Sequence, residues 1–388
     1  MRAYRAGKRI NMDTDVKLSG PPAADSLPAA GNPVVSAASP RHPDAIDPPS
    51  LVVTPGVESG SALPSGASPG LSRAGGVALT IGLCPPEKVN LHGVETGREA
   101  LSHTRLGSLL ACPQRYFWRY EKGLEPAVKR VALEMGSAFA HALEVNDPFA
   151  GSDMVLARWA DAVDENAGNP WIVLPSEEDA EVTATTVRAA ARAYLDHFGH
   201  ADVQREVTMR ARLRNPETGA YSKTFDVQAR IDGLAGDRLI EDKFVGRVDP
   251  VTERRLLLDR QVTIGTYLIW RTTGELIRDV SYRMTKKPSI RRKQGESHNE
   301  FLHRLERDYA ERPDFYLQEF TLTRGPDDFL RLEAELWDWA ESIRRHRRAS
   351  VFPRNTAACS DFGGCEFIDA CVRAPGWESQ FVERGEFG

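Results

Sequence analysis

The chain has 388 residues, a formal net charge of −5 and a mean hydropathy of −0.40. No stretch approaches the roughly 20 consecutive apolar residues that a membrane-spanning helix needs, and the basic start of the chain lacks the apolar core of a secretory signal. We therefore expect a soluble, cytoplasmic protein without membrane association. The negative charge provides no global field that attracts nucleic acid, so any such binding must be local.

The first part of the chain is poor in residues that build a core. Tyr4 is the only aromatic residue before Tyr116, and residues 18–76 are dominated by Pro, Ser, Ala and Gly. Such a segment cannot bury enough apolar surface to offset the entropy of ordering. We expect a disordered leader over 1–76 and a connecting segment over 77–100. A targeting segment and an over-extended gene start are the alternatives for the leader.

From about residue 101 to 380 the sequence pattern is that of a globular α/β region. Helices are predicted at 101–120, 180–198 and 328–348, and strands at 205–213, 227–245 and 279–285. The helix at 180–198 is preceded by a capping box formed by Ser176 and Asp179. This mixture predicts a small central sheet surrounded by helices.

The stretch at 227–245 reads as a hairpin that places Asp232, Glu241 and Lys243 on adjacent strands. Because strand side chains alternate, Glu241 and Lys243 point to one side and Asp242 to the other. Two carboxylates beside one lysine can bind a divalent cation, which polarises a phosphodiester and lowers the pKa of a bound water. The alternative is an ordinary salt-bridge ladder between strands.

The cysteines form a second candidate site. Cys359, Cys365 and Cys371 follow a C-x5-C-x5-C spacing within a total of five cysteines. An odd number without a secretory signal argues against disulfides, and clustered thiolates favour a metal site that needs a fourth ligand. The metal site could hold zinc or a 4Fe-4S cluster. Zinc sites usually contain closely spaced C-x2-4-C pairs, which this chain lacks, so the spacing disfavours zinc without excluding it. Cys84 is expected to be an incidental thiol.

Positive residues cluster at two places. Those between 283 and 293 are expected to contact nucleic-acid phosphates: Arg283, Lys286, Lys287, Arg291, Arg292 and Lys293. A solvated loop is the alternative. For the second cluster, RRHRR at 344–348, cations at a helix end are the better interpretation.

Five segments resemble, in order, the RecB-like branch of the PD-(D/E)xK nuclease superfamily. They are the helix at 101–120 with its Cys-Pro, GSAFAHALE at 136–144, the hairpin, RQVTIGTYLIW at 260–270, and the cysteine segment at 355–371. The D…ExK element alone is short and frequent by chance. The order of all five segments over about 101–372 is far more specific.

The resemblance implies a fold and a set of site residues. The fold is a restriction-endonuclease-like core, with a small mixed central sheet flanked by helices, over residues 101–380. The implied catalytic residues are Asp232, Glu241 and His141 as ligands of one or two Mg or Mn ions, Lys243 beside the attacking water, and Gln261 beside the lysine or the nucleic acid.

Some positions match the family less closely or have an ordinary alternative. The family's tyrosine four residues after the glutamine is replaced by Gly265, and Tyr267 comes two residues later, so no role is assigned to Tyr267. A lone histidine on a helix, such as His141, is most often only a polar residue. Glu206 is a weaker candidate for the acidic cluster because strand glutamates are usually solvated.

The resemblance also supplies Cys112 as the fourth ligand, with Cys359, Cys365 and Cys371, of a 4Fe-4S cluster. Such a cluster would tie the helix at 104–120 to the C-terminal segment. The implied function is a metal-dependent DNA nuclease, an exonuclease of DNA ends or single strands, of the stand-alone phage or prophage type. The chain has no Walker motif, so unwinding would come from a helicase, recombination or CRISPR partner. A non-catalytic DNA-binding or scaffold subunit and a zinc-stapled adaptor are the alternatives.

Overall fold

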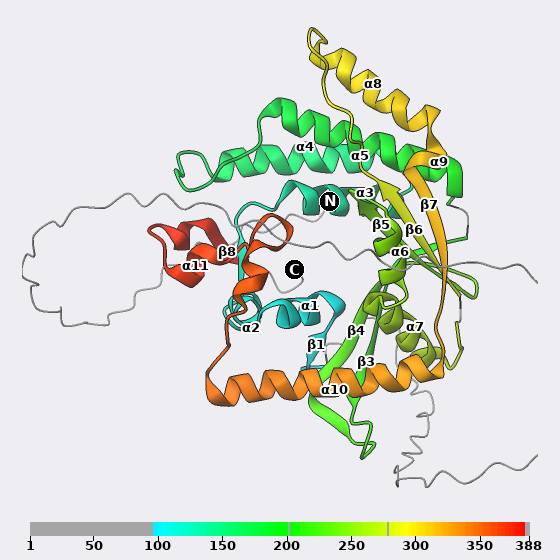
Figure 1. Cartoon of the computed structure of the whole chain (residues 1–388), viewed down its shortest axis with the longest axis vertical. Helices are drawn as coiled ribbons and strands as arrows, with labels where there is room; N and C mark the ends of the chain where they lie inside the picture. The colour runs from blue at the N-terminus through cyan, green and yellow to red at the C-terminus, as the bar shows by residue number, and fades with distance from the viewer. Residues whose placement is uncertain (1–95, 201, 278, 385–388) are drawn as a thin grey trace, which may run out of the picture. The chain divides into compact units, whose positions relative to one another are not determined.

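The computed structural model describes residues 96–200, 202–277 and 279–384. The expected leader, and the connecting segment up to residue 95, lie outside the described residues. The described part is an α/β fold in which helices flank a central mixed sheet (Figure 1), as the sequence predicts. None of its helices combines the length and apolar character needed to cross a bilayer.

The central sheet contains six strands in the described part of the chain. They are β1 (Glu99–Leu101), β3 (Gln204–Arg214), β4 (Tyr221–Ala235), β5 (Arg238–Val245), β6 (Asp279–Lys286) and β7 (Leu317–Thr323). The order is β1-β4-β5-β6-β7, with β3 on the other edge of β4. The β1–β4 and β5–β6 pairs are parallel and the remaining pairs antiparallel.

The edge of β4 that faces away from β3 is shared by two strands. β1 pairs with its first half at Phe225–Val227, and β5 pairs with its last residues at Gly233–Ala235. Val227 and Leu234 each pair with β3 as well, which places β1 and β5 on the same edge. The sheet therefore forks along residues 228–232, where β4 leaves β1 before it meets β5.

One face of the sheet is covered by a helical layer rich in alanine and aromatic residues. It consists of α3 (Val131–Glu144), α4 (Pro148–Glu165), α5 (Glu177–Phe198) and α8 (His298–Glu311), followed by the short α9 (Pro313–Tyr316). Phe244 of β5 stacks on Phe139 of α3, which joins the sheet to this layer. The predicted capping box at Ser176 is confirmed at the start of α5.

The other face is covered by α1 (His103–Ala111), α7 (Arg260–Thr273) and α10 (Pro326–Ala349), with the short α6 (Pro250–Leu256) leading into α7. Their apolar faces form the largest core together with β3, β4 and β6. Charge is buried in this layer at Glu333 of α10, which accepts from the Tyr267 hydroxyl at 2.7 Å and lies 3.3 Å from Arg271.

A small third core joins the two ends of the described chain. β2 (Leu124–Pro126) pairs antiparallel with β8 (Phe381–Glu383), and α2 (Pro113–Tyr116), α11 (Ile368–Val372) and three short turns of other helix types complete this region. The predicted single helix at 101–120 is divided, because the chain is extended at Cys112 and Pro113 then starts α2. A π-helical turn follows at Phe117–Glu121.

The three helices α3, α4 and α5 meet closely at Gly151. A Cβ added there would lie 2.6 Å from the Ala138 carbonyl oxygen and 2.8 Å from Val187 Cγ1. We predict that Gly151→Ala lowers the free energy of unfolding by about 1–3 kcal/mol through overpacking. Gly107→Ala in α1 is the matched control: nothing lies within 4 Å of its Cβ, so it should stabilise by about 0.5–1 kcal/mol. Equal stability in chemical denaturation would contradict this packing.

Candidate metal and nucleic-acid site at the sheet fork

Asp232 lies at the point where the sheet forks. It directly precedes the residues of β4 that pair with β5, and its carboxylate Oδ2 accepts the backbone amide of Asp242 at 2.9 Å. The side chain thus takes the hydrogen bond that a strand partner would otherwise provide. This contact fixes Asp232 against β5 beside Glu241, its cross-strand neighbour.

The alternation predicted for β5 is confirmed. Lys243 and Glu241 contact each other through Nζ and Oε1, and Lys243 Nζ also donates to Gln261 Oε1 at 3.0 Å. Gln261 lies in the first turn of α7, which is capped by Asp259 through a 2.8 Å bond from the Gln261 amide. The structure therefore joins three of the predicted site residues, from β5 and α7, in one chain of contacts.

Burial raises the pKa of Glu241 well above its usual value, the nearby Lys243 charge opposes this, and Asp232 and Asp259 add to it. Burial lowers the pKa of Lys243, but the same three carboxylates outweigh this effect, so the net shift is upward and the ammonium stays charged. One ammonium therefore faces three carboxylates. This arrangement favours an additional cation, and its oxygen donors are those that Mg and Mn prefer.

Asp242 points to the opposite face of β5, as predicted. It accepts from the Tyr194 hydroxyl at 2.6 Å and contacts Arg205, in a buried network that ties β5 to α5 and β3. Arg283 joins this network by donating to Tyr194 at 3.0 Å and pairing with Glu319 at 3.0 Å. Its side chain is only 13% exposed, so the geometry gives Arg283 a structural role instead of a surface for phosphates.

A pocket of about 360 Å³ opens beside the fork. Asp232, Lys243 and Glu206 line it from the sheet together with Arg205, Arg230, Asp242 and Phe244. From α3 it is lined by small residues such as Gly136 and Ala140 and by larger ones such as Leu133 and Phe139. Asp232 and Glu206 are half-buried and line the pocket. The candidate site is therefore both buried at Glu241 and open at Asp232.

Glu206 is the residue that sequence reasoning undervalued. Its neighbours pair as Arg205 with Gly233 and Val207 with Ile231, which places Glu206 opposite Asp232. Its backbone has a positive φ of 54°, which is costly for a non-glycine residue. Burial raises the pKa of its carboxyl group, Arg230 opposes this, and Asp232 adds to it. The alternating pattern of a strand sequence does not reveal a positive φ such as that of Glu206.

His103 was also missed. It begins α1 and its Nδ1 is buried without a hydrogen-bond partner among the described residues. Burial lowers its pKa, Asp259 opposes this, and Lys243 adds to it, which places the ring near the charged residues of the site. The predicted His141, in contrast, lies on α3 with its Nδ1 3.6 Å from Glu144.

No three His, Cys, Asp or Glu side chains within the described ranges lie close enough together to hold a metal ion as they are placed. In this conformation the positive charge beside Glu241 comes from Lys243. The donor set at the fork nevertheless fits a divalent cation, because its carboxylates outnumber the cations that neutralise them.

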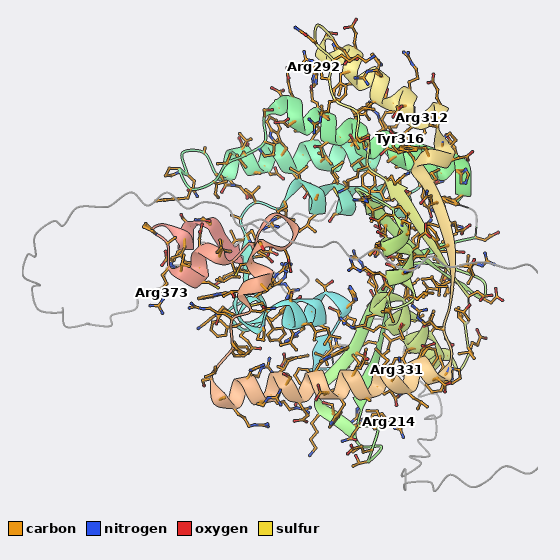
Figure 2. All side chains as sticks on the ribbon, viewed as in Figure 1. Arg214, Arg292, Arg312, Tyr316, Arg331 and Arg373 are labelled. Atoms are coloured by element: carbon orange, nitrogen blue, oxygen red, sulfur yellow. The ribbon has the colours of Figure 1, made fainter. Side chains whose placement is uncertain are left out.

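The predicted basic residues divide into two groups. Lys287 lies at the edge of the pocket, where Nζ donates to the Ala132 carbonyl at 3.3 Å, and Lys286 lies over the Phe315 ring at 3.8 Å. Arg291, Arg292 and Lys293 are exposed in the loop before α8, and Arg292 lies well away from β5 (Figure 2). Of these five residues, Lys287 is the one whose side chain contacts residues that line the pocket, Ala132 and Phe244.

The structure places Cys112, which follows α1, and Cys359 in the same neighbourhood as Cys371. Cys112 Sγ accepts the Asn355 amide at 3.3 Å, and Cys371 Sγ accepts from the Trp118 indole at 3.2 Å. Burial raises the pKa of the Cys371 thiol, and the nearby Cys112 and Cys359 thiols add to it. The four described cysteines form no disulfide.

Thiolate sulfurs accept hydrogen bonds from N–H donors of the kind that point at Cys112 and Cys371. Cys365 is held next to Cys359 by a 2.8 Å bond between their backbones. Thiols are the ligand type of zinc sites and iron-sulfur clusters, but as the side chains are placed no three of the described cysteines lie close enough together to hold a metal ion.

The buried carboxyl of Glu241 predicts a pH-dependent stability. Its folded pKa is raised, so its contribution is favourable below the unfolded pKa of about 4.3 and is lost as the pH rises. We therefore expect Glu241→Gln to raise the melting temperature at pH 7, with the gain disappearing below about pH 4. Glu217→Gln, at an exposed turn, is the matched control. A variant less stable than the wild type at pH 7 would contradict the prediction.

Comparison with known proteins places this geometry in a family. The model of the PD-(D/E)XK nuclease superfamily matches residues 100–372, from β1 to the last cysteine. The chain is also similar to a crystal structure of a "Putative exonuclease" from Eubacterium rectale, with 13% identity, a TM-score of 0.39, and coverage of 72% of this chain and 90% of that one. No curated protein matches. Because the family match spans most of the chain, this protein belongs to the PD-(D/E)XK nuclease superfamily.

Proposed function

We propose that the protein is a metal-dependent DNA nuclease, an exonuclease that hydrolyses phosphodiester bonds at DNA ends or in single strands. The observation that carries this proposal is the contact between Glu241, Lys243 and Gln261 on one face of β5, beside Asp232 at the fork. Two carboxylates that can bind a metal ion, with a charged lysine beside them at an open pocket, are the groups that metal-dependent phosphodiester hydrolysis needs.

Asp232 and Glu241 would hold one or two Mg or Mn ions. When bound, the metal polarises the phosphodiester and lowers the pKa of a water molecule. The excess of carboxylates at the fork supports this assignment. His141 is proposed as a further ligand from the resemblance: its neighbour Ala140 lines the pocket, and His141 itself does not. Glu206 adds a carboxylate opposite Asp232.

Lys243 would act as an ammonium. Because its pKa is raised, it donates hydrogen bonds and stabilises negative charge on the phosphate, and it positions the attacking water. Gln261 holds its Nζ in place. The water oxygen forms a bond to phosphorus while the bond to the leaving oxygen breaks. The water proton passes to solvent, and the leaving oxygen keeps the bonding electron pair and takes a proton from solvent to become a hydroxyl. No covalent enzyme intermediate forms.

Nucleic acid would reach the site over the edge that carries Lys287. This lysine is the predicted cation nearest the pocket, whereas Arg291, Arg292 and Lys293 would contact only a longer substrate. Phosphate contacts of this kind add affinity without sequence preference.

The finer placement is the RecB-like, iron-sulfur branch of the superfamily. The four cysteines near one another support a 4Fe-4S cluster held by Cys112, Cys359, Cys365 and Cys371, with zinc as the alternative. The cluster would fasten α1 and α2 to the C-terminal segment. A helicase, recombination or CRISPR protein is the proposed partner, and the phage or prophage type is the proposed setting.

The nuclease activity is tested with end-labelled single- and double-stranded DNA in Mg, Mn or chelator. We expect metal-dependent cleavage that falls at least about 100-fold in Asp232→Asn and in Lys243→Ala. Asp237→Asn, in the exposed β4–β5 turn, is the matched control. The wild type should also gain thermal stability with Mn, and Asp232→Asn should not. Equal cleavage by all variants would refute the assignment, and metal-independent DNA binding without cleavage would favour a scaffold subunit.

The cysteine assignment is tested on protein purified without oxygen. We expect iron and sulfide in the wild type, a visible absorbance band, and loss of both with a lower melting temperature in Cys112→Ser and in Cys371→Ser. Cys84→Ser should leave the iron content unchanged. Zinc in place of iron would support the alternative, and wild-type protein without either metal would refute both.

A further inference from the structure

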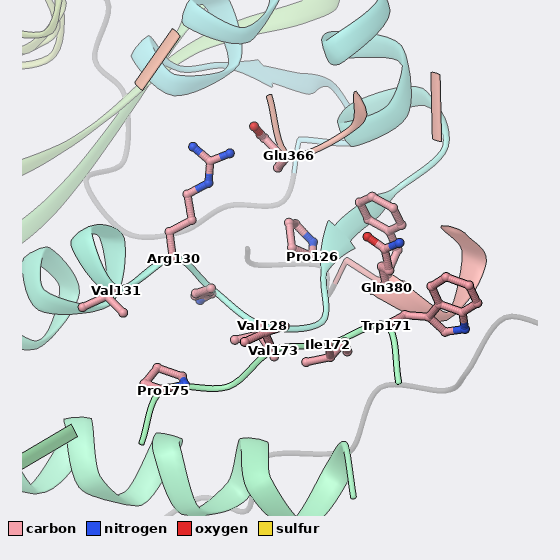
Figure 3. A pocket seen from close by; sticks show the side chains of 12 residues that line it. Pro126, Val128, Arg130, Val131, Trp171, Ile172, Val173, Pro175, Glu366 and Gln380 are labelled. Carbon is pink, nitrogen blue, oxygen red and sulfur yellow. The ribbon is translucent and has the colours of Figure 1, made fainter. Parts of the chain in front are cut away.

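A second pocket, of about 300 Å³, lies between the start of α3, the loop before α5 and the C-terminal segment. Figure 3 shows Arg130 and Glu366 on one side of it, and Val128, Ile172 and Val173 on the other. It therefore has an apolar wall and a charged wall. This combination suits a ligand with both an apolar face and an anionic group.

The second pocket adjoins the first at three consecutive residues of α3. Val131 lines the second pocket, whereas Ala132 and Leu133 line the pocket at the fork. The Lys287 ammonium donates to the Ala132 carbonyl, so a cation lies at the boundary between them. A chain that leaves the fork over this boundary enters the second pocket directly.

The charge of the second pocket favours an anion. Its carboxylate, Glu366, is neutralised by Arg115 at 2.8 Å and Arg119 at 3.7 Å. The exposed Lys129 adds a further positive charge to this wall beside Arg115 and Arg119. An apolar peptide carries no anionic group that could pair with these cations, whereas a nucleotide carries a phosphate that could.

The apolar wall is held in a fixed position. The Trp171 ring packs so closely on Gly376 that an added Cβ there would lie 2.3 Å from Trp171 Cε2. Asn169 of the same loop donates to the Ser379 carbonyl at 3.1 Å, and the Trp159 indole donates to the Pro175 carbonyl at 2.9 Å. Val173, held between these anchors, is nevertheless 92% exposed. A rigid exposed apolar surface costs little ordering entropy when it binds a ligand.

We infer that the second pocket binds a nucleobase of the single strand whose phosphodiester lies at the fork. The inference rests on the proposed function in taking the fork as the site of cleavage. Val173 and Val128 contact the face of the base, Lys129 and Lys287 contact the flanking phosphates, and Gln380 offers its Oε1 to a base N–H while its Nε2 donates to Asp369 at 3.0 Å. The pocket would thereby favour single strands over duplex DNA.

The test uses Lys243→Ala protein with chelator, so that binding is measured without cleavage. Val173→Asp puts a negative charge on the exposed wall without disturbing the fold, and Val251→Asp, at a 67% exposed valine of α6, is the matched control. We expect Val173→Asp to weaken binding of a dodecathymidylate at least about 10-fold, the size of one lost base contact. The control should change it less than about 2-fold.

A direct readout is a photoreactive thymidine placed at successive positions of the same oligonucleotide. One position should crosslink to the peptide that contains residues 171–173. Equal affinity of the two variants, or crosslinks that never reach this peptide, would overturn the inference and leave the pocket to a protein partner. If the wild type fails to cleave DNA but the crosslink forms, the proposed nuclease function fails and the base pocket remains.

Discussion

The fork in the central sheet is the constraint on which the site depends. β4 is a 15-residue strand whose one edge is shared by β1 at one end and β5 at the other. Between these ladders a carboxylate replaces a strand partner, because Asp232 accepts the Asp242 amide. A continuous β4–β5 ladder would bury Asp232 in ordinary cross-strand pairing. The separation of the strands instead opens a pocket in which acidic residues of β3, β4 and β5 meet.

Three consecutive residues of β5, 241–243, contribute both to stability and to the candidate site. Asp242 is neutralised on one face by Tyr194 and Arg205, whereas Glu241 and Lys243 on the other face leave carboxylates in excess. The first arrangement is a satisfied buried network, which anchors the strand. The second stores unfavourable charge, which is the usual cost of a site prepared to bind a cation. Because the Asp242 network holds β5 rigidly, the repulsion between the excess carboxylates near Glu241 cannot be relieved by a shift of the strand.

The parts of this structure that follow from local patterns could be predicted. Alternation along β5 separated Glu241 and Lys243 from Asp242, and the capping box placed the start of α5. Tertiary geometry could not be predicted in the same way. The twist at Glu206 and the placement of His103 near Lys243 depend on which strands and helices pack together. Arg283 belongs to a basic run in the sequence, yet its position on β6 directs its side chain into the buried network.

The two ends of the domain support the fork through β1. This strand forms one arm of the fork and leads directly into α1, whose last turn precedes Cys112. Arg347 near the end of α10 pairs with Glu99 of β1 at 2.6 Å and with Glu121 at 2.7 Å. α10 in turn leads into the segment that carries the other cysteines. Fastening Cys112 to that segment therefore closes a loop through α1, β1 and α10. The proposed staple, far from Asp232 in sequence, would thus restrict the strand that keeps the fork open and would join the cysteines and the acidic site into one mechanical unit.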